Sequence, residues 1–212
     1  MNFIRKIFSH FLLSNTDDKD SVRENIASVL DNKENTENIS KQEQLMLRNV
    51  LKINEITARD IMIPRANISA VEASNTLDSV LEIFLEEAHS RAPVYEKNLD
   101  NIIGMVYKDT VLETMADDYF EKTMADIVEP VESVYETESV ESVLNKFTKN
   151  RSHMFIVKDE FGGTTGIVTL EDCIETLLGV EIMDESDEVA DMRKLAKDQQ
   201  RQKKRSQDKG SS

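Results

Sequence analysis

The pattern of hydrophobic and polar positions occurs twice along the chain. The segment at 57–64 reads TARDIMIP, and its counterpart at 123–130 reads TMADIVEP. The segment at 76–84 reads TLDSVLEIF, and its counterpart at 139–147 reads SVESVLNKF, with apolar residues at matching places on one helical face. A repeat of this kind predicts two copies of one supersecondary unit that stack on each other to bury a shared core.

Each copy predicts a strand, a helix, two more strands and a final helix. The first helix of each copy opens on a hydroxyl residue suited to an N-cap. One copy buries too little apolar surface to be stable alone, so we expect the copies, at 57–118 and 123–180, to pack as a pseudo-symmetric pair of class α+β. The later elements are expected at matching places: strands at 92–95 and 154–157, strands through Gly104 and Gly166, and helices from near Asp109 and Leu170.

A helix is predicted just before the first repeat. Ser40 and Glu43 have the spacing of a capping box, in which each side chain bonds the other residue's backbone N–H. An apolar stripe follows them, which favours a helix at 41–54. The segment 40–56 is therefore expected to lead into the repeat as a helix.

The two ends of the chain have weaker patterns. Residues 1–39 form an N-terminal extension, and its start at 1–14 has two interpretations: an amphipathic turn on a membrane, or a loosely docked terminal helix. Residues 181–212 are acidic and then basic, with no core pattern, which indicates a tail. The polar stretch at 15–38 indicates a flexible linker with one weak helix around Val22, Ile26, Val29 and Leu30.

Composition narrows the function classes. The net charge of −15 argues against nucleic-acid binding, because phosphate contacts need clustered Lys and Arg. A single cysteine excludes an intramolecular disulfide, and with no Cys/His cluster for zinc a reducing cytoplasm is the simplest compartment. No stretch approaches the ~20 apolar residues that span a bilayer, and no signal peptide is expected. No catalytic set has supporting context, so we do not expect an enzyme.

The strongest family resemblance lies in the second repeat. Residues 158–172 read KDEFGGTTGIVTLED, an acidic turn with two glycines followed by Gly-x-Val-Thr-x-Glu-Asp. The chain resembles the CBS-domain pair, and within it the CorC/HlyC (CNNM-like, hemolysin C-related) family. The leader DIMIPR at 60–65 and the exit at 181–192 are similar to that family as well, so the resemblance spans 41–195.

The resemblance implies a regulatory module that binds an adenine nucleotide, ATP or AMP, with magnesium held by its phosphates. It also implies a homodimer that serves magnesium or cobalt transport with a membrane transporter as partner. The expected location is the cytoplasm, at the inner face of the plasma membrane if 1–14 makes peripheral contact. The family's transmembrane and C-terminal transporter-associated domains are not expected in this chain. The alternative is a ligand-independent dimeric scaffold at the membrane surface.

Thr169 and Asp172 are the first candidates for the nucleotide site. A carboxylate at 172 can accept hydrogen bonds from both ribose hydroxyls, and Thr169 at a helix start can face phosphate. The same Thr-x-x-Asp spacing is a capping box, and it occurs again at Thr57/Asp60 and Thr123/Asp126, where we expect capping only. Ligand contact and pure capping both stay open at 169–172.

The remaining candidates follow from the resemblance, since CBS pairs build an intact site with a strand from the opposite repeat. Arg65 is a candidate phosphate contact, with an ordinary surface arginine as the alternative. His153 is expected to pack or cap and not to bind metal. The full set that would line the site beside Thr169 and Asp172 is Ile63, Pro64, Arg65, Asn67, His153, Met154, Ile167 and Val168.

Several other features receive structural interpretations. The first repeat has no hydroxyl residue three places before Asp109, so its equivalent site is expected to be weak or empty. Cys173 fits a buried helix face, where thiols are inert. The acidic run at 184–188 lacks the spacing of a calcium loop and is expected to be a solvated face. Residues 162–163 are expected to form a hairpin turn, because no Gly-Lys-Ser/Thr follows them.

Overall fold

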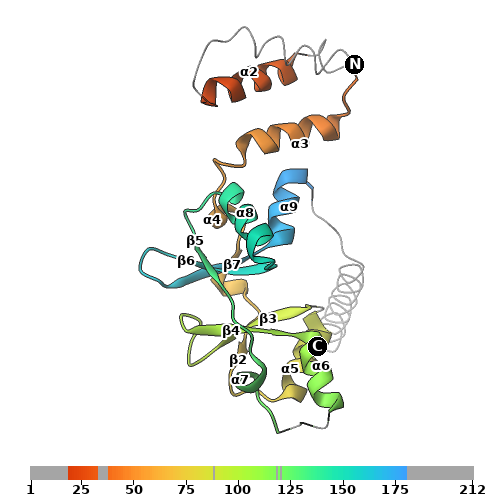
Figure 1. Cartoon of the computed structure of the whole chain (residues 1–212), viewed down its shortest axis with the longest axis vertical. Coiled ribbons are helices and arrows are strands. Elements are labelled where there is room, and N and C mark those ends of the chain that lie inside the picture. Colours follow the sequence, from red (N-terminus) through yellow and green to blue (C-terminus); the bar gives the residue numbers. More distant parts are fainter. Residues whose placement is uncertain (1–18, 33–37, 88, 118, 120, 181–212) are drawn as a thin grey trace, which may run out of the picture. The chain divides into compact units, whose positions relative to one another are not determined.

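The computed structural model divides the chain into two compact units (Figure 1). It describes residues 19–32, 38–87, 89–117, 119 and 121–180. None of the helices in this part of the chain has the length and the apolar run that crossing a bilayer requires. The described residues of the first unit are 19–32, 38–63, 133–161 and 165–180; those of the second lie within 64–132 and at 162–164.

The first unit contains most elements of the second repeat, the start of the first repeat and the helices that precede the first repeat. Its sheet has the strand order β1-β7-β6-β5, with β5 and β6 parallel. Residue 162 has a φ of +85° in the predicted turn between β6 and β7, a value that favours glycine. The elements are α2 (Lys19–Asp31), α3 (Lys41–Lys52), α4 (Ala58–Ile61), β1 (Ile63–Pro64), β5 (Ser133–Tyr135), α8 (Val140–Asn150), β6 (Met154–Lys158), β7 (Thr164–Thr169) and α9 (Leu170–Leu178).

The second unit contains the body of the first repeat. Its sheet has the order β2-β3-β4, in which β2 and β3 are parallel and β3 and β4 antiparallel. The strands and helices predicted from sequence are present in both units, which confirms the α+β class. The elements are η1 (Arg65–Asn67), β2 (Val71–Glu72), α5 (Leu77–Glu87), β3 (Arg91–Tyr95), β4 (Ile102–Tyr107), α6 (Lys108–Ala116) and α7 (Met124–Ile127).

The compact units do not coincide with the sequence repeats. The short helix that opens each repeat, which we call its leader helix, belongs to the unit that contains the rest of the other repeat. Helix α4 opens the first repeat, yet Ala58 N–H donates to the Glu138 carbonyl at 2.8 Å in the first unit. Helix α7 opens the second repeat, yet Met124 N–H donates to the Asn75 carbonyl at 3.0 Å in the second unit. Each repeat therefore completes the core of the other unit.

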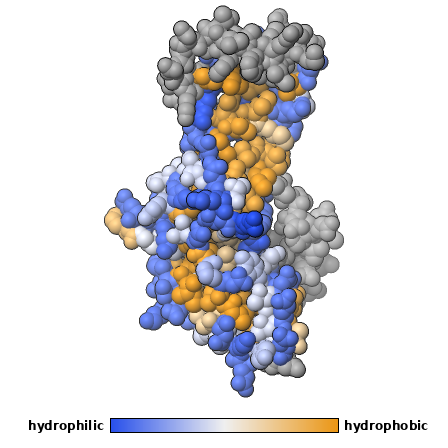
Figure 2. All heavy atoms as spheres, in the orientation of Figure 1, coloured by the Kyte–Doolittle hydropathy of each residue, from blue (hydrophilic) through white to orange (hydrophobic). Residues whose placement is uncertain are grey.

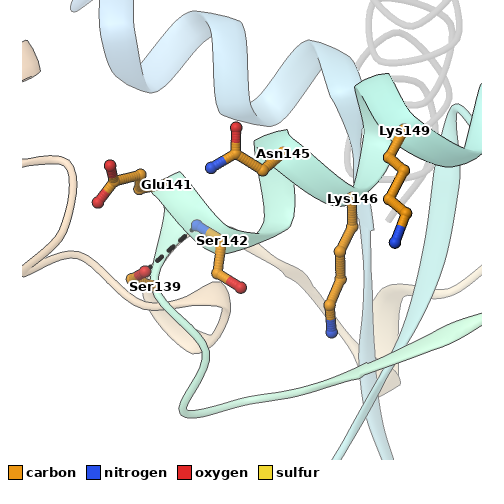
Figure 3. Close-up of a pocket in the computed structure, with 6 residues that line it drawn as sticks. All are labelled: Ser139, Glu141, Ser142, Asn145, Lys146 and Lys149. Carbon is orange, nitrogen blue, oxygen red and sulfur yellow. Dashed lines mark hydrogen bonds between the residues drawn. The ribbon is translucent and has the colours of Figure 1, made fainter.

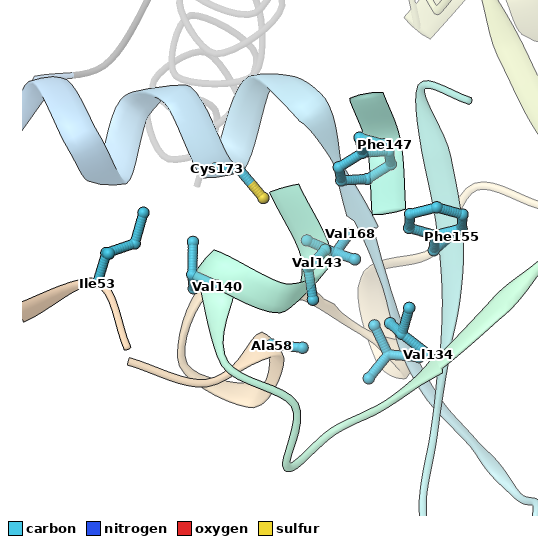
Figure 4. Packing of buried hydrophobic residues seen from close by; sticks show 10 residues of the cluster. Ile53, Ala58, Val134, Val140, Val143, Phe147, Phe155, Val168 and Cys173 are labelled. Atoms are coloured by element: carbon cyan, nitrogen blue, oxygen red, sulfur yellow. The ribbon is translucent and has the colours of Figure 1, made fainter. Parts of the chain in front are cut away.

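The core of the first unit lies between its sheet and helices α8 and α9 (Figure 4). The rings of Phe147 and Phe155 stack there, with centroids 4.3 Å apart. A Cβ atom at Gly166 would lie 2.5 Å from the Ile63 carbonyl oxygen, so glycine lets the leader backbone approach β7. The buried members are Ile53, Ala58, Val134, Val140, Val143, Phe147, Phe155, Val157, Val168 and Cys173.

The second unit has a matching core. Phe84 is 1% exposed in it, like Phe147 in the first unit, and the helix residue Met124 is fully buried. A Cβ atom at Gly104 would lie 2.2 Å from the Glu129 carbonyl oxygen, which is the same close approach as at Gly166. The buried members are Val71, Ala73, Leu77, Val80, Phe84, Ala92, Val94, Val106, Val111 and Met124.

The predicted helix at 41–54 is confirmed as α3, and its capping box is complete. Ser40 N–H donates to Glu43 at 2.7 Å, and Glu43 N–H donates to the Ser40 hydroxyl at 3.2 Å. The apolar residues on the outer side of the helix are half exposed, Val50 at 52%. Figure 2 shows apolar residues gathered over the part of the first unit that contains α3 and α9.

The extension before α3 is more ordered than predicted. The helix predicted around Val22, Ile26, Val29 and Leu30 is confirmed as α2, and it takes up 13 residues, 19–31, of the segment expected to be a flexible linker. The reason is tertiary: Leu30 is 2% exposed, and Arg48 of α3 donates to its carbonyl and pairs with Asp31 at 2.6 Å. The interpretations of 1–14 and of 181–212 lie outside the described residues.

Candidate functional site

The junction of β7 and α9 carries the residues predicted to hold ribose. Asp172 accepts two hydrogen bonds at one carboxylate oxygen, Oδ2, from the Thr169 N–H at 2.7 Å and from the Thr169 hydroxyl at 2.6 Å. Asp172 N–H donates back to the Thr169 hydroxyl oxygen at 3.3 Å. The capping interpretation is therefore confirmed here, and ligand contact stays a prediction in addition to it.

The other carboxylate oxygen of Asp172, Oδ1, accepts no hydrogen bond from the described part of the chain. A carboxylate has about four lone-pair directions, and the two bonds from Thr169 use only those of Oδ2. Asp172 is partly buried, so as a whole it is less exposed to water than a surface carboxylate residue. The cap and a ligand can thus share one side chain without competing for the same oxygen.

The electrostatics separate this capping box from the two others. Burial raises the pKa of Asp172, against the opposing effect of its hydrogen bonds from threonine. The pKa values of Asp60 and Asp126 are lowered instead, chiefly by the Thr57 hydroxyl for Asp60 and by the Thr123 backbone N–H for Asp126. Those two carboxylates are solvated caps, whereas the charge at Asp172 is costly until another donor reaches it.

The start of α9 offers little to a phosphate group. Leu170 N–H donates to the His153 carbonyl at 3.1 Å, and Asp172 N–H is used by the capping box. The Thr169 hydroxyl already donates to Asp172. The Glu171 N–H, in the first turn of α9, has no hydrogen-bond partner in the described part of the chain. A phosphate contact by Thr169 stays a prediction, and it requires the hydroxyl to change partner.

The apolar candidates lie on different faces of the sheet. Met154 and Ile167 are 4% and 6% exposed and stay outside the cluster that packs on α8 and α9. Val168 is 0% exposed and belongs to that cluster, because successive side chains of a strand point to opposite faces. The side chain of Val168 therefore does not lie beside Ile167, and only its backbone is left for a ligand.

His153 and Ile63 complete the predicted residues of the first unit. His153 has an exposed side chain, and its backbone carbonyl accepts from Leu170 N–H. That the side chain packs or caps stays a prediction. Ile63 lies in β1 beside β7 and faces Gly166 through its backbone. Both positions stay candidates for ligand contact that no observation tests.

Pro64, Arg65 and Asn67 belong to the second unit, where Arg65 is already paired. Its guanidinium donates through Nη1 and Nη2 to the Asp100 carboxylate and through Nη1 to the Thr164 carbonyl at 3.0 Å. Thr164 N–H donates to the same carboxylate at 3.1 Å. The bond to Asp100 raises the pKa of Arg65, and the bond from Arg65 lowers the pKa of Asp100.

Asp100 is the residue that sequence reasoning missed. It lies 35 residues from Arg65 in the turn between β3 and β4, and nothing in the local pattern distinguishes it from other acidic turn residues. Arg65 is 39% exposed, so it is a surface arginine with a carboxylate partner, and its contact with phosphate stays a prediction. A phosphate that binds Arg65 has to replace or share the Asp100 carboxylate.

The equivalent junction of the first repeat, between β4 and α6, is built from other side chains. Tyr107 occupies the N-cap position and makes no side-chain cap. Lys108 N–H donates to the Ser90 carbonyl at 3.0 Å, and the Arg91 guanidinium lies 5.9 Å from the Tyr107 ring centroid. Asp109 lies in the first turn of the helix without a capping threonine. That this junction binds no nucleotide stays a prediction.

Cys173 is packed in the core next to the candidate site. Its side chain is 0% exposed, and burial raises the pKa of its thiol to about 12. The thiolate is the nucleophilic form, so this thiol is inert at neutral pH, as the helix-face pattern predicted. In the described part of the chain no three metal-binding side chains gather, and the acidic run at 184–188 lies outside it.

A shallow hollow of about 360 Å³ lies on α8, away from these residues (Figure 3). The predicted nucleotide residues are absent from its lining. Lys146, one of its two lysines, pairs with Glu138 at 2.6 Å. The hollow is therefore a polar surface feature of the helix and adds no candidate ligand contact. Its lining residues are Ser139, Glu141, Ser142, Asn145, Lys146 and Lys149.

Comparison with known proteins identifies the repeats. The CBS domain family matches residues 58–117 and 124–179. The structure of the CBS domain of the bacterial CNNM/CorC family Mg²⁺ transporter is similar, with 37% sequence identity, a TM-score of 0.71, and coverage of 76% of this chain and 98% of that chain. The structure of that CBS domain in complex with ATP has 38% identity and a TM-score of 0.63, over 66% of this chain and 99% of that one.

Among curated proteins, the magnesium and cobalt efflux protein CorC of Pasteurella multocida is 33% identical over 198 residues, or 92% of this chain and 64% of that protein. The chain spans between 50% and 64% of the length of this and the other CorC relatives that it matches. Similarity to the transporter's CBS domain covers almost the whole of that domain. The chain therefore belongs to the CBS-domain family, as a tandem CBS pair of the CNNM/CorC type.

Proposed function

We propose that this chain is a regulatory module that binds an adenine nucleotide and thereby adjusts the transport of magnesium or cobalt. The observation that carries the proposal is the partly buried Asp172 carboxylate, with Oδ2 held by Thr169 and Oδ1 open. The ATP complex of a CBS domain with 38% identity supports the choice of ligand. The names of the relatives support the choice of cation.

Ribose is the part of the nucleotide that this carboxylate recognises. Its two adjacent hydroxyls are donors, and Oδ1 of Asp172 has lone pairs for both. Hydrogen bonds to a carboxylate are stronger than neutral ones, and they gain further in a partly buried place where water competes less. Binding thus relieves the cost of burying this charge, which a solvated cap such as Asp126 does not incur.

The base and the phosphates are assigned to the remaining predicted residues. The buried Met154 and Ile167 share the sheet face opposite the α8–α9 core and suit the base. Arg65 and Asn67 are the proposed phosphate contacts, and Arg65 gives up part of its pairing with Asp100 when it binds. Magnesium accompanies the nucleotide on its phosphates.

The signal needs a recipient. Following the relatives named as transporters, we propose that a membrane transporter at the inner face of the plasma membrane receives it, and that the module acts as a homodimer. The nucleotide can shift the module's equilibrium only by its difference in affinity for two states. The size of regulation is therefore limited by that difference.

Calorimetric titration of the full chain with ATP and with AMP, with and without magnesium, tests the proposal. We expect binding of at least one nucleotide. Asp172→Ala is expected to weaken it by roughly 10-fold to 100-fold, the value of one or two hydrogen bonds to a charged group. No binding heat at millimolar nucleotide would end the sensor hypothesis.

The matched control is Asp126→Ala. It removes the same kind of capping carboxylate, from a box with the same threonine bonds but without burial. Its ATP affinity is expected to equal that of the original chain. If both variants, checked as folded by circular dichroism, keep full affinity, the ribose contact lies elsewhere.

A further inference from the structure

The C-terminal end of α9 is capped by side chains from a distant helix. Gln42 of α3 donates from Nε2 to the Leu178 carbonyl at 2.8 Å, and Asn49 of α3 donates from Nδ2 to the Leu177 carbonyl at 3.3 Å. The last carbonyls of a helix have no partner within it and are satisfied by a following turn, by water or by other groups. Here α3 supplies donors for two of them.

Helix α3 also lies directly against the residue that ends α9. Gly179 has a φ of 68° and donates its N–H to the Glu175 carbonyl at 2.7 Å. A Cβ atom at this position would lie 2.7 Å from Leu45 and 2.8 Å from Asn49, both on α3. Glycine is required twice here, by the backbone conformation and by the closeness of α3 (Figure 1).

The other end of the same helix carries the proposed ribose contact. Thr169 and Asp172 form its first turn, and Cys173 fixes its middle in the core. A helix of nine residues is about 13 Å long. The same short rod thus has a candidate ligand at one end and α3 at the other. A movement of a packed helix is shared by both of its ends, because its backbone bonds keep it rigid.

The attachment of α3 is suited to release. No residue of α3 is buried, and the first core residue follows only at its end, where Ile53 is 8% exposed. Its contacts with α9 include the two amide bonds and the packing of Leu45 beside Gly179. Helix α2 is linked to α3 through Arg48, which pairs with Asp31, so α2 follows α3 when it moves.

We propose that α3 reports nucleotide occupancy: ATP at the Thr169–Asp172 end of α9 shifts the equilibrium between α3 docked on the other end and α3 released. This rests on the proposed function, and it names the element that carries the output of the site. By thermodynamic reciprocity, weakening the docking of α3 changes ATP affinity by the same factor that ATP changes the docking. Helices α2 and α3 then form the movable part that a partner reads.

Hydrogen–deuterium exchange of the full chain, with and without ATP, tests the proposal. We expect ATP to slow the exchange of α3 backbone amides as well as those of α9. In Gln42→Ala/Asn49→Ala the slowing in α3 disappears and the one in α9 remains. The matched control is Gln44→Ala, because Gln44 lies on the same helix but donates to the Ile39 carbonyl and not to α9.

The reciprocal measurement is ATP affinity by calorimetry. The double variant is expected to change the Kd by about fivefold or more, the lower range of measured couplings, and Gln44→Ala by less than twofold. Equal affinities in the double variant and the control would overturn the inference, as would ATP binding that leaves α3 exchange unchanged in the original chain. Absence of ATP binding heat would end the proposed function and this inference together. ATP binding without coupling to α3 would end this inference alone and leave the proposed function standing.

Discussion

The two strand-to-helix junctions of the repeats share a backbone and differ in their side chains. At the β7–α9 junction Leu170 N–H donates to the His153 carbonyl at 3.1 Å, and at the β4–α6 junction Lys108 N–H donates to the Ser90 carbonyl at 3.0 Å. The residues before the helices have similar extended conformations, with φ near −110° and −102°. A capping box is present only at the first of these junctions. The strand-to-helix turn therefore forms with the box at one junction and without it at the other.

The comparison within the capping boxes adds a second distinction. The boxes at Thr57 and Thr123 cap exchanged leader helices of four residues and face water. The box at Thr169 caps a longer helix and is partly buried. The same four-residue pattern thus has different electrostatic consequences, as the opposite pKa shifts of Asp60 and Asp172 show.

The largest expected loss of stability comes from substitutions in the two cores. Phe147→Ala and Phe84→Ala each remove a buried ring and are expected to lower the free energy of unfolding by about 3–5 kcal/mol. Phe147 also loses its stack on Phe155, worth about 0.5–1.5 kcal/mol more. Urea unfolding followed by circular dichroism measures both. A larger loss for Phe84→Ala would contradict the importance of the stack.

The next largest loss of stability is expected from the two glycines that lie against the chain next to the leader helices. Gly166→Ala and Gly104→Ala place a Cβ atom against backbone carbonyl oxygens, so each is expected to cost about 1–3 kcal/mol of stability. The two repeats should respond alike, because the close approach is common to both. Thermal unfolding of the two variants checks this, with Gly162→Ala as a control that tests backbone strain in open space. No loss in either variant would mean that the leaders can shift freely.

Loss of a cap has a smaller effect. Thr169→Ala removes the hydroxyl that accepts from Asp172 N–H and is expected to destabilise the chain by about 1 kcal/mol. Thr123→Ala is expected to cost less, because the Thr123 hydroxyl donates to Asp126 at 2.9 Å but accepts no hydrogen bond from a helix N–H. Chemical unfolding compares the two variants. Only Thr169→Ala should also lower ATP affinity, and a loss of ATP binding in both would point to a general effect on the fold.

The smallest expected effect is a difference in pH dependence. The folded pKa of Asp172 is raised, so the folded state binds more protons than the unfolded state, and Asp172 adds stability as pH falls through the range just above 3.8. The folded pKa of Asp126 is lowered, so its contribution is present above 3.8 and is lost as pH falls below it. Unfolding curves of Asp172→Asn and Asp126→Asn between pH 3 and 7 should differ from the original chain with opposite slopes, and equal slopes would contradict the burial of Asp172.

Local sequence patterns were sufficient for much of the fold. The helices, the strands of the hairpins and the capping boxes depend on residues a few places apart, whose geometry is set by backbone hydrogen bonds. The repeat itself predicted a tandem pair. Even the inertness of Cys173 followed from its place on a helix face.

Tertiary structure decided which of these local features became buried or paired with distant residues. The burial of Asp172, the pairing of Arg65 with Asp100 and the capping of α9 by Gln42 and Asn49 all join residues or surfaces far apart in sequence. No local pattern distinguishes them, because desolvation and long-range hydrogen bonds exist only after the chain closes on itself. The sequence by itself thus determined a CBS-type repeat with three Thr-x-x-Asp motifs, and only the fold showed that the third of them is partly buried while the other two are exposed.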